Sequence, residues 1–183
     1  KDPEWEDRYP GKSTIEMITL APFEWFEKSA NQGNVDAQWQ LACRYARGKG
    51  VEVDNRKSVI WSKKAAIKGH VKAQYSVGLS YELGIGGEKD SRKAFEWMEK
   101  SAKKGDSEAQ FKLGIYYRTG VGVIKDDMKS CEWYEKAAMQ CHPQAQYSLG
   151  INYMYGKGVN KDPRKAFVWL EKAAKQNISV AQV

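Results

Sequence analysis

Residues 145–174 read AQYSLGINYMYGKGVNKDPRKAFVWLEKAA, and the pattern of this stretch returns along most of the chain. Tryptophan recurs every 36 residues, at Trp25, Trp61, Trp97, Trp133 and Trp169. The pair Ala-Gln keeps the same period, at Ala37-Gln38, Ala73-Gln74, Ala109-Gln110, Ala145-Gln146 and Ala181-Gln182. Tyrosine does so at Tyr45, Tyr81, Tyr117 and Tyr153. A period of this length, held by several residue types without an insertion, predicts stacked helical hairpins.

Each period contains two helical patterns separated by turn residues. Between Asp90 and Gly105, Phe95, Met98 and Ala102 follow the three-and-four spacing of an apolar helix stripe. Asp90 suits the N-cap of this helix, and Gly105 suits its end. Residues 107–119 show a second helical pattern, which ends in a glycine-containing loop. One period therefore predicts one antiparallel hairpin, and the whole chain is predicted to be all-α.

Small residues recur inside the second helix of the pattern, at Ala42, Gly78, Gly114 and Gly150. Glycine in a helix interior costs about 1 kcal/mol relative to alanine. Its return at one register therefore predicts that two helices approach closely there. The recurring aromatic residues predict an inter-repeat core rather than a ladder on which ligands stack.

With these positions fixed, the sequence resembles the Sel-one-like (SLR) repeat family. The positions that carry the resemblance in one period are Leu149, Gly150, Tyr153, Gly156, Gly158, Val159, Asp162, Ala166, Trp169, Lys172, Ala173 and Ala174. The resemblance implies a right-handed superhelical α/α solenoid of antiparallel hairpins, similar to tetratricopeptide arrays. It also implies an adaptor that binds a protein or peptide, or, as in some bacterial relatives, an immunity protein that neutralises a secreted toxin.

The period also gives the domain organisation. Residues 1–21 are predicted to be an N-terminal extension with a short capping helix, and residues 22–183 to be the repeat array. Within the array we expect a half repeat at 22–35, full repeats at 36–71, 72–107, 108–143 and 144–179, and the start of another at 180–183.

Two segments depart from the repeated pattern. The helix-ending glycine of three periods becomes Cys141 in the fourth, and cysteine adopts a left-handed conformation poorly. The turn at residue 141 is therefore predicted to differ from the others. Before the array, Ser13-Thr14-Ile15-Glu16 resembles a capping box, which predicts the start of the capping helix.

Composition and charge exclude several classes of protein. The 183 residues are 42% hydrophobic and 29% charged, as in a folded soluble protein. No segment approaches 18 consecutive apolar residues, so we expect no membrane insertion. The net charge of +7 comes mainly from two separate blocks, residues 36–71 with +5 and residues 144–183 with +4. A nucleic-acid binder would more often carry one continuous basic stripe, so nucleic acid is not the expected partner.

Reactive groups are few and scattered. His70 and His142 fall in connections, and His142 beside Cys141 lacks the ligand spacing of a zinc site. The glycine pairs such as Gly156-Lys157-Gly158 follow a helix rather than a strand, which argues against a dinucleotide loop. The recurring Asp54, Asp90, Asp126 and Asp162 are explained as N-caps. We therefore predict no catalysis, no cofactor and no metal.

The three cysteines do not form a disulfide framework. Cys131 and Cys141, taken as lying on one helix, would be about 15 Å apart at 1.5 Å per residue, which is too far to bridge. Cys43, Cys131 and Cys141 are accordingly predicted to be small buried or half-buried residues.

The predicted partner-binding surface consists of positions that differ between repeats. At 100° per residue, positions 40, 44 and 47 share a side of the helix away from its apolar stripe. Placed on the concave face, the set is Gln40, Arg44, Arg47, Ser76, Ser80, Leu83, Lys112, Tyr116, Thr119, Ser148, Asn152 and Tyr155.

Two alternatives to a protein-binding scaffold remain from the residues alone: a binder of cell-wall polysaccharide through exposed aromatic side chains, and an accessory subunit of an enzyme. The polar start of the chain lacks the apolar core of a signal peptide, yet Lys1 is not a methionine. The compartment is therefore open, with a lean to the bacterial periplasm or secretion if a signal peptide has been removed.

Overall fold

The computed structural model describes the backbone of residues 14–176 and the side chains from residue 23 onward. In this range the chain forms α-helices joined by short loops. The helices are α2 (Thr14–Asn31), α3 (Val35–Arg47), α4 (Asn55–Ile67), α5 (Val71–Leu83), α6 (Ser91–Lys103), α7 (Ser107–Thr119), α8 (Asp127–Met139), α9 (Pro143–Tyr155) and α10 (Pro163–Lys175). No strand occurs among the described residues, so the predicted all-α class is confirmed. The backbone of α2 continues across the boundary predicted at residues 21 and 22, and Ser13 lies outside the described residues.

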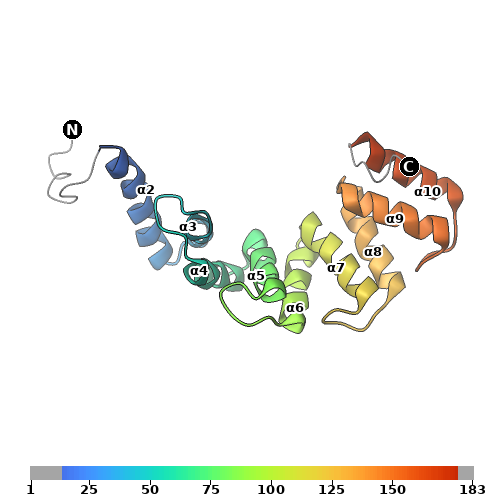
Figure 1. Ribbon diagram of the computed structural model, residues 1–183, viewed down its shortest axis with the longest axis horizontal. Helices are drawn as coiled ribbons and strands as arrows, with labels where there is room; N and C mark the ends of the chain where they lie inside the picture. The colour runs from blue at the N-terminus through green and yellow to red at the C-terminus, as the bar shows by residue number, and fades with distance from the viewer. Residues whose placement is uncertain (1–13, 177–183) are drawn as a thin grey trace.

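Successive helices pack against each other along an arc (Figure 1). The substantial contacts between helices all join neighbours in the chain, from α2 with α3 to α9 with α10. Helices α2 and α10 lie at opposite ends, and α3 and α5 lie toward the inner side of the arc relative to α4 and α6. The predicted solenoid of stacked hairpins is confirmed.

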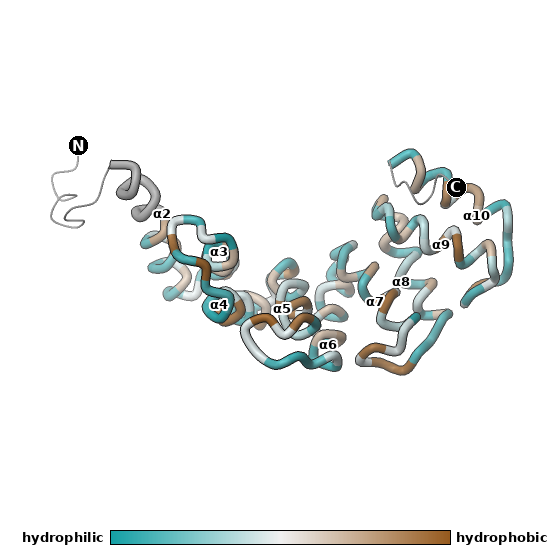
Figure 2. The backbone as a smooth tube through the Cα atoms, viewed as in Figure 1, coloured by the Kyte–Doolittle hydropathy of each residue, from teal (hydrophilic) through white to brown (hydrophobic). Residues whose placement is uncertain are grey.

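Apolar residues are distributed in short patches, on the helices and in loops such as the one between α7 and α8, rather than in long runs, as Figure 2 shows. Within the described part of the chain, no helix has the length and hydropathy needed to cross a membrane.

Side-chain caps define where each helix begins. The Asp side chain before each of α4, α6, α8 and α10 accepts the backbone N–H three residues later, for example Lys93 N–H to Asp90 Oδ1 at 2.9 Å. The N-cap role predicted for Asp54, Asp90, Asp126 and Asp162 is thereby confirmed. The N-caps of α3, α5, α7 and α9 are Asn34, His70, Asp106 and His142.

The turn at Cys141 corrects the prediction made for it. Cys141 has φ +61°, in the same left-handed region as Gly105 at φ +95°. The backbone N–H groups of Cys141 and Gly105 both donate to a carbonyl three residues earlier, at 3.0 Å. The packing of α8 and α9 therefore imposes the shared turn on a residue that tolerates it poorly. Cys141 also lies after α8 rather than on it, and its side chain is exposed, whereas Cys43 is half-buried and Cys131 buried.

The glycine inside α7 shows why small residues recur there. A Cβ atom on Gly114 would overlap the ring of Tyr134, and one on Gly150 would lie 2.7 Å from Leu170 Cγ. Gly78 is similarly covered by Met98, whose side-chain atoms would lie 3.0 Å from a Cβ. In the three hairpins that carry glycine here, the two helices can approach only because these side chains are missing, so the close approach predicted for the glycines is confirmed.

The recurring glutamine makes the joint between successive hairpins. Gln110 Nε2 donates to the Ala102 carbonyl at 3.1 Å, and Gln38, Gln74 and Gln146 repeat the same bond to the preceding hairpin. This carbonyl belongs to the last turn of a helix, where intrahelical partners run out. In each of these four periods the buried amide thus adds a second hydrogen bond to a carbonyl that already accepts the backbone N–H three residues later.

The tryptophans depart from a uniform inter-repeat core. Trp61 is buried, but Trp97, Trp133 and Trp169 are half-buried, and Trp25 is 78% exposed. Each of these tryptophans other than Trp25 has a lysine three residues later whose ammonium group lies over the indole ring. Lys100 Nζ, for example, lies 4.2 Å from the Trp97 ring centroid. The position therefore combines half burial with a cation–π contact at the surface.

The histidine cap of α5 predicts a dependence of stability on pH. His70 Nδ1 accepts the Ala73 N–H at 3.1 Å, which requires an unprotonated nitrogen, and the ring stacks on Trp39. Burial lowers the pKa of His70, while the Asp36 carboxylate, 3.8 Å from Nε2, opposes this and Lys72 adds to it.

Because the pKa of His70 is lower in the folded state, the unfolded chain binds the proton more tightly. We expect the free energy of unfolding to fall as the pH drops below about 6.5, the ordinary pKa of histidine, toward the folded value. The loss should not exceed about 1 kcal/mol, the typical value of a cap. Denaturant titrations from pH 7.5 to 5 measure it.

His70→Asn is the matched variant, since Asn34 caps α3 in the same way. Its unfolding free energy should change less with pH than that of the parent protein. If the unfolding free energies of the variant and the parent protein change equally with pH, His70 protonation has no role.

Candidate functional site

The predicted binding surface divides into three rows, one for each position in the repeat. The first and third rows are exposed or half-buried; they comprise Gln40, Ser76, Lys112 and Ser148, and Arg47, Leu83, Thr119 and Tyr155. The middle row, Arg44, Ser80, Tyr116 and Asn152, is less accessible, and two of its members are buried. The expected placement of Tyr116 and Asn152 on an accessible face is therefore wrong, while the partner-binding role of the set stays a prediction.

Tyr116 turns toward the preceding repeat instead of the solvent. Its side chain is 2% exposed, and its ring centroid lies 6.3 Å from that of Phe95. Burial, and then the nearby Glu82 carboxylate, raise the pKa of Tyr116. Helix α7 packs against both α6 and α8, so its buried arc is wider than that of a helix with one neighbour.

Asn152 occupies the same place one repeat later. It is 6% exposed, and Nδ2 donates to the Cys131 sulfur at 3.0 Å. The Cys131 thiol donates in turn to the Lys157 carbonyl at 3.0 Å. Arg44, at the start of the array, lies with its guanidinium 4.5 Å from the centroid of the Phe26 ring. Three members of the middle row therefore contact the preceding repeat, whereas the Ser80 hydroxyl donates to the Ser76 carbonyl of its own helix at 2.9 Å.

The eight residues of the first and third rows form what we call the inner face. Among them, Leu83 and Tyr155 expose large side chains, with Tyr155 at 65%. Lys112 Nζ is held 3.1 Å from Glu82 Oε2. Arg47, Gln40 and Thr119 add hydrogen-bonding groups, so the inner face changes from basic and polar near α3 to aromatic near α9.

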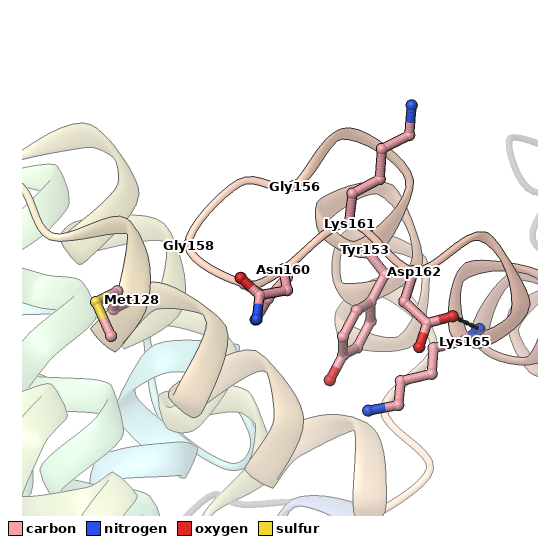
Figure 3. A pocket seen from close by; sticks show the side chains of 9 residues that line it. Met128, Tyr153, Gly156, Gly158, Asn160, Lys161, Asp162 and Lys165 are labelled. Atoms are coloured by element: carbon pink, nitrogen blue, oxygen red, sulfur yellow. Dashed lines mark hydrogen bonds between the residues drawn. The ribbon is translucent and has the colours of Figure 1, made fainter.

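A wide pocket of about 760 Å³ lies beside the loop between α9 and α10. Its lining residues are Met128, Tyr153, Gly156, Gly158, Val159, Asn160, Lys161, Asp162 and Lys165. Figure 3 shows the side chains of Tyr153, Asp162 and Lys165 close together, and Lys165 Nζ lies 5.3 Å from the Tyr153 ring centroid. The same Tyr–Lys contact occurs in each earlier hairpin, so this pocket is built largely from residues that every repeat needs.

A smaller pocket of about 320 Å³ lies between α7, α8 and α9. Its lining residues are Arg118, Thr119, Lys125, Asp127, Ser130, Asn152 and Lys157. The sequence did not reveal this pocket, because it brings together two helix ends and two loops from successive repeats. The signal that would have pointed to it is Arg118, which replaces Ala46, Glu82 and Met154 of the other repeats.

In the part of the chain that the structure describes, metal binding or nucleophilic chemistry would depend on clustered His, Cys, Asp and Glu side chains and on reactive cysteines. No group of three or more His, Cys, Asp or Glu side chains there has a metal-binding arrangement. Burial raises the pKa of the Cys131 thiol, which opposes formation of the nucleophilic thiolate.

The model of the Sel1 repeat matches residues 23–34, 35–70, 71–106, 107–140 and 143–178. A protective antigen of uropathogenic Escherichia coli with an SLR fold is 32% identical, with a TM-score of 0.86 over 98% of this chain and 38% of that one. A Sel1 repeat protein from Oxalobacter formigenes is 38% identical, with a TM-score of 0.83 over 90% of this chain and 48% of that one. The chain thus spans less than half of either structure.

Two further similarities are more distant or more local. An immunity protein from Pseudomonas aeruginosa shares the fold at 21% identity, with a TM-score of 0.55 over 96% of this chain and 71% of that one. The human all-trans-retinol 13,14-reductase is 40% identical over 52 residues, which are 28% of this chain and 7% of that protein. Because the match covers 7% of the reductase, it gives no ground for assigning the activity of that enzyme to this chain.

Proposed function

This chain belongs to the Sel1 repeat family, and from that premise we propose that it is a non-catalytic scaffold that binds another protein on its inner face. The observation that carries the proposal is the contrast between two sets of positions. The residues that hold the hairpins together recur, as Gln110 and its counterparts do, whereas those of the inner face change from repeat to repeat. Packing constrains the first set and leaves the second free to fit a partner.

The exposed chemistry of the inner face supports a protein partner. Arginine and tyrosine are common anchors of protein interfaces, since both bury a large area and offer hydrogen bonds. Arg47 and Tyr155 are both exposed, and they lie toward opposite ends of the array. A partner that contacts both would extend along several repeats.

The test begins with isolation of the partner by crosslinking and affinity capture from the native organism. We expect Arg47→Ala or Tyr155→Ala to weaken binding of that partner by about 2 kcal/mol or more, roughly a 30-fold loss of affinity. The melting temperature should stay unchanged, because both side chains are exposed. Calorimetric titration of each variant measures the affinity.

Arg56→Ala and Phe167→Ala are the controls, because both remove an exposed side chain outside the inner face. They should bind the partner with the affinity of the parent protein. Equal affinities of all four variants would reject the inner face. Specific binding of a cell-wall polysaccharide without a protein partner, or the stimulation of an enzyme's turnover, would favour one of the alternatives.

A narrower version of the proposal is that the partner is a secreted toxin. It is supported by the similarity in fold to an immunity protein over most of the chain. In that case, co-expression of the chain should rescue growth of cells that produce the captured partner, and an inner-face variant that loses binding should not.

A further inference from the structure

The pocket between α7, α8 and α9 has room for part of a bound partner. At about 320 Å³ it exceeds the space of one water, about 30 Å³, by a wide margin. Thr119 belongs both to this pocket and to the inner face. The pocket therefore adjoins the inner face at Thr119.

Positive charge predominates around this pocket. Arg118, Lys125 and Lys157 contribute three cations and Asp127 one carboxylate, a surplus of two positive charges. Lys125 Nζ lies 3.7 Å from Asp127 Oδ2. Neither Arg118 nor Lys157 forms an ion pair with a carboxylate of the described residues, although Arg118 lies close enough to the Tyr134 hydroxyl to oppose the rise that burial causes in the pKa of that group. Their positive charges are therefore not neutralised within the described part of the chain.

Buried polar groups form the inner wall of the pocket. Ser130, 1% exposed, donates to the Gly114 carbonyl at 2.7 Å, so its oxygen position is fixed. The Asn152 amide donates one N–H to the Cys131 sulfur, and its second N–H can donate to another acceptor. Because Cys131 also donates to the Lys157 carbonyl, one chain of hydrogen bonds joins this wall to the loop that carries Lys157.

The combination occurs at one junction of the array. In the preceding repeat the counterpart of Arg118 is Glu82, which pairs with Lys112, and the counterpart of Asn152 is Tyr116. A group of residues needed for stacking would recur, as the glutamine joint does. The cationic pocket is therefore a local addition to the repeat.

We propose that this pocket binds the carboxylate of an acidic side chain of the protein partner. The inference rests on the proposed scaffold function and adds the chemistry of one contact. A guanidinium offers a carboxylate two parallel hydrogen bonds, and a lysine adds a point charge. Arg118 and Lys157 supply these groups, and the Asn152 amide supplies a further donor from the inner wall.

The first experiment uses small probes, so that it does not depend on the partner. Backbone amide shifts of the isotope-labelled protein are followed by NMR during titration with N-acetyl-aspartate N-methylamide. The asparagine analogue serves as the uncharged probe, and inorganic phosphate serves as the free anion. We expect the aspartate probe to shift Thr119, Asn152 and Lys157, and the asparagine probe to leave them unchanged.

Two variants make the test specific. Arg118→Gln should weaken binding of the aspartate probe at least 10-fold, whereas Lys89→Gln, the same change of charge at the counterpart of Lys125, should leave it unchanged. Equal response to the asparagine probe, saturation by phosphate alone, or an unchanged affinity of Arg118→Gln would each overturn the inference.

Affinities of the variants for the isolated partner then distinguish this inference from the scaffold proposal. If inner-face variants lose the partner and Arg118→Gln retains full affinity, the scaffold proposal stands and the carboxylate pocket is rejected. A loss of at least 10-fold in Arg118→Gln, with binding by Lys89→Gln preserved, supports both.

Discussion

Tyr134→Ala is expected to lower the free energy of unfolding by about 3 to 5 kcal/mol, the usual cost of truncating a buried aromatic side chain to alanine. Tyr134 is among the largest fully buried side chains of the described residues. Its ring fills the space left by the missing side chain of Gly114, and its centroid lies 5.7 Å from that of Phe111. Truncation would leave a cavity between α7 and α8, and Gly114 has no side chain that could fill it.

Urea unfolding followed by circular dichroism measures this loss. Glu132→Ala is the control, because Glu132 is an exposed residue of the same helix, and its unfolding free energy should change by less than about 0.5 kcal/mol. Similar losses in the two variants would show that α8 is packed in another orientation.

Gly122→Ala is expected to lower the free energy of unfolding by about 2 to 5 kcal/mol, from two causes that act together. Gly122 has φ +71°, and placing a non-glycine residue in the left-handed region costs about 1 to 2 kcal/mol. In addition, the new Cβ would overlap the backbone carbonyl of Ser91 at the start of α6, which cannot swing away as a side chain could. Overpacking of this kind typically costs about 1 to 3 kcal/mol.

Gly105→Ala separates the two causes. Gly105 also has positive φ, at +95°, but a Cβ there would meet nothing within 4 Å. Its loss should therefore be limited to about 1 to 2 kcal/mol, the backbone term alone. If Gly122→Ala and Gly105→Ala melt at the same temperature, the loop of one repeat does not press on the helix of the one before.

The repeated residues made the fold predictable, because each of them has one local task. Asp90 and its counterparts cap helices, Gly114 and its counterparts admit a neighbouring helix, and these tasks can be recognised from position and residue type. The predicted second helix, residues 107–119, coincides with α7. The Cys141 turn was missed because its backbone is set by the helices on either side rather than by its own preference.

The candidate site was less predictable, because it depends on contacts between repeats. A helical wheel separates one apolar stripe from one polar side, and Tyr116 and Asn152 fall on the polar side. Each nevertheless packs on a helix from the preceding repeat, which the wheel does not represent. The pocket around Arg118 has the same origin, since its residues come from two hairpins and meet only after stacking.

The restriction of substantial contacts to consecutive helices gives the array the mechanics of springs connected in series. A tension applied to its two ends acts equally on every interface, so the weakest joint determines the load at which the structure opens. Small rotations at successive joints add together, and the arc can tighten or straighten while each interface stays within its own elastic range. A long partner would therefore be accommodated by small changes at many joints rather than by the movement of a single hinge.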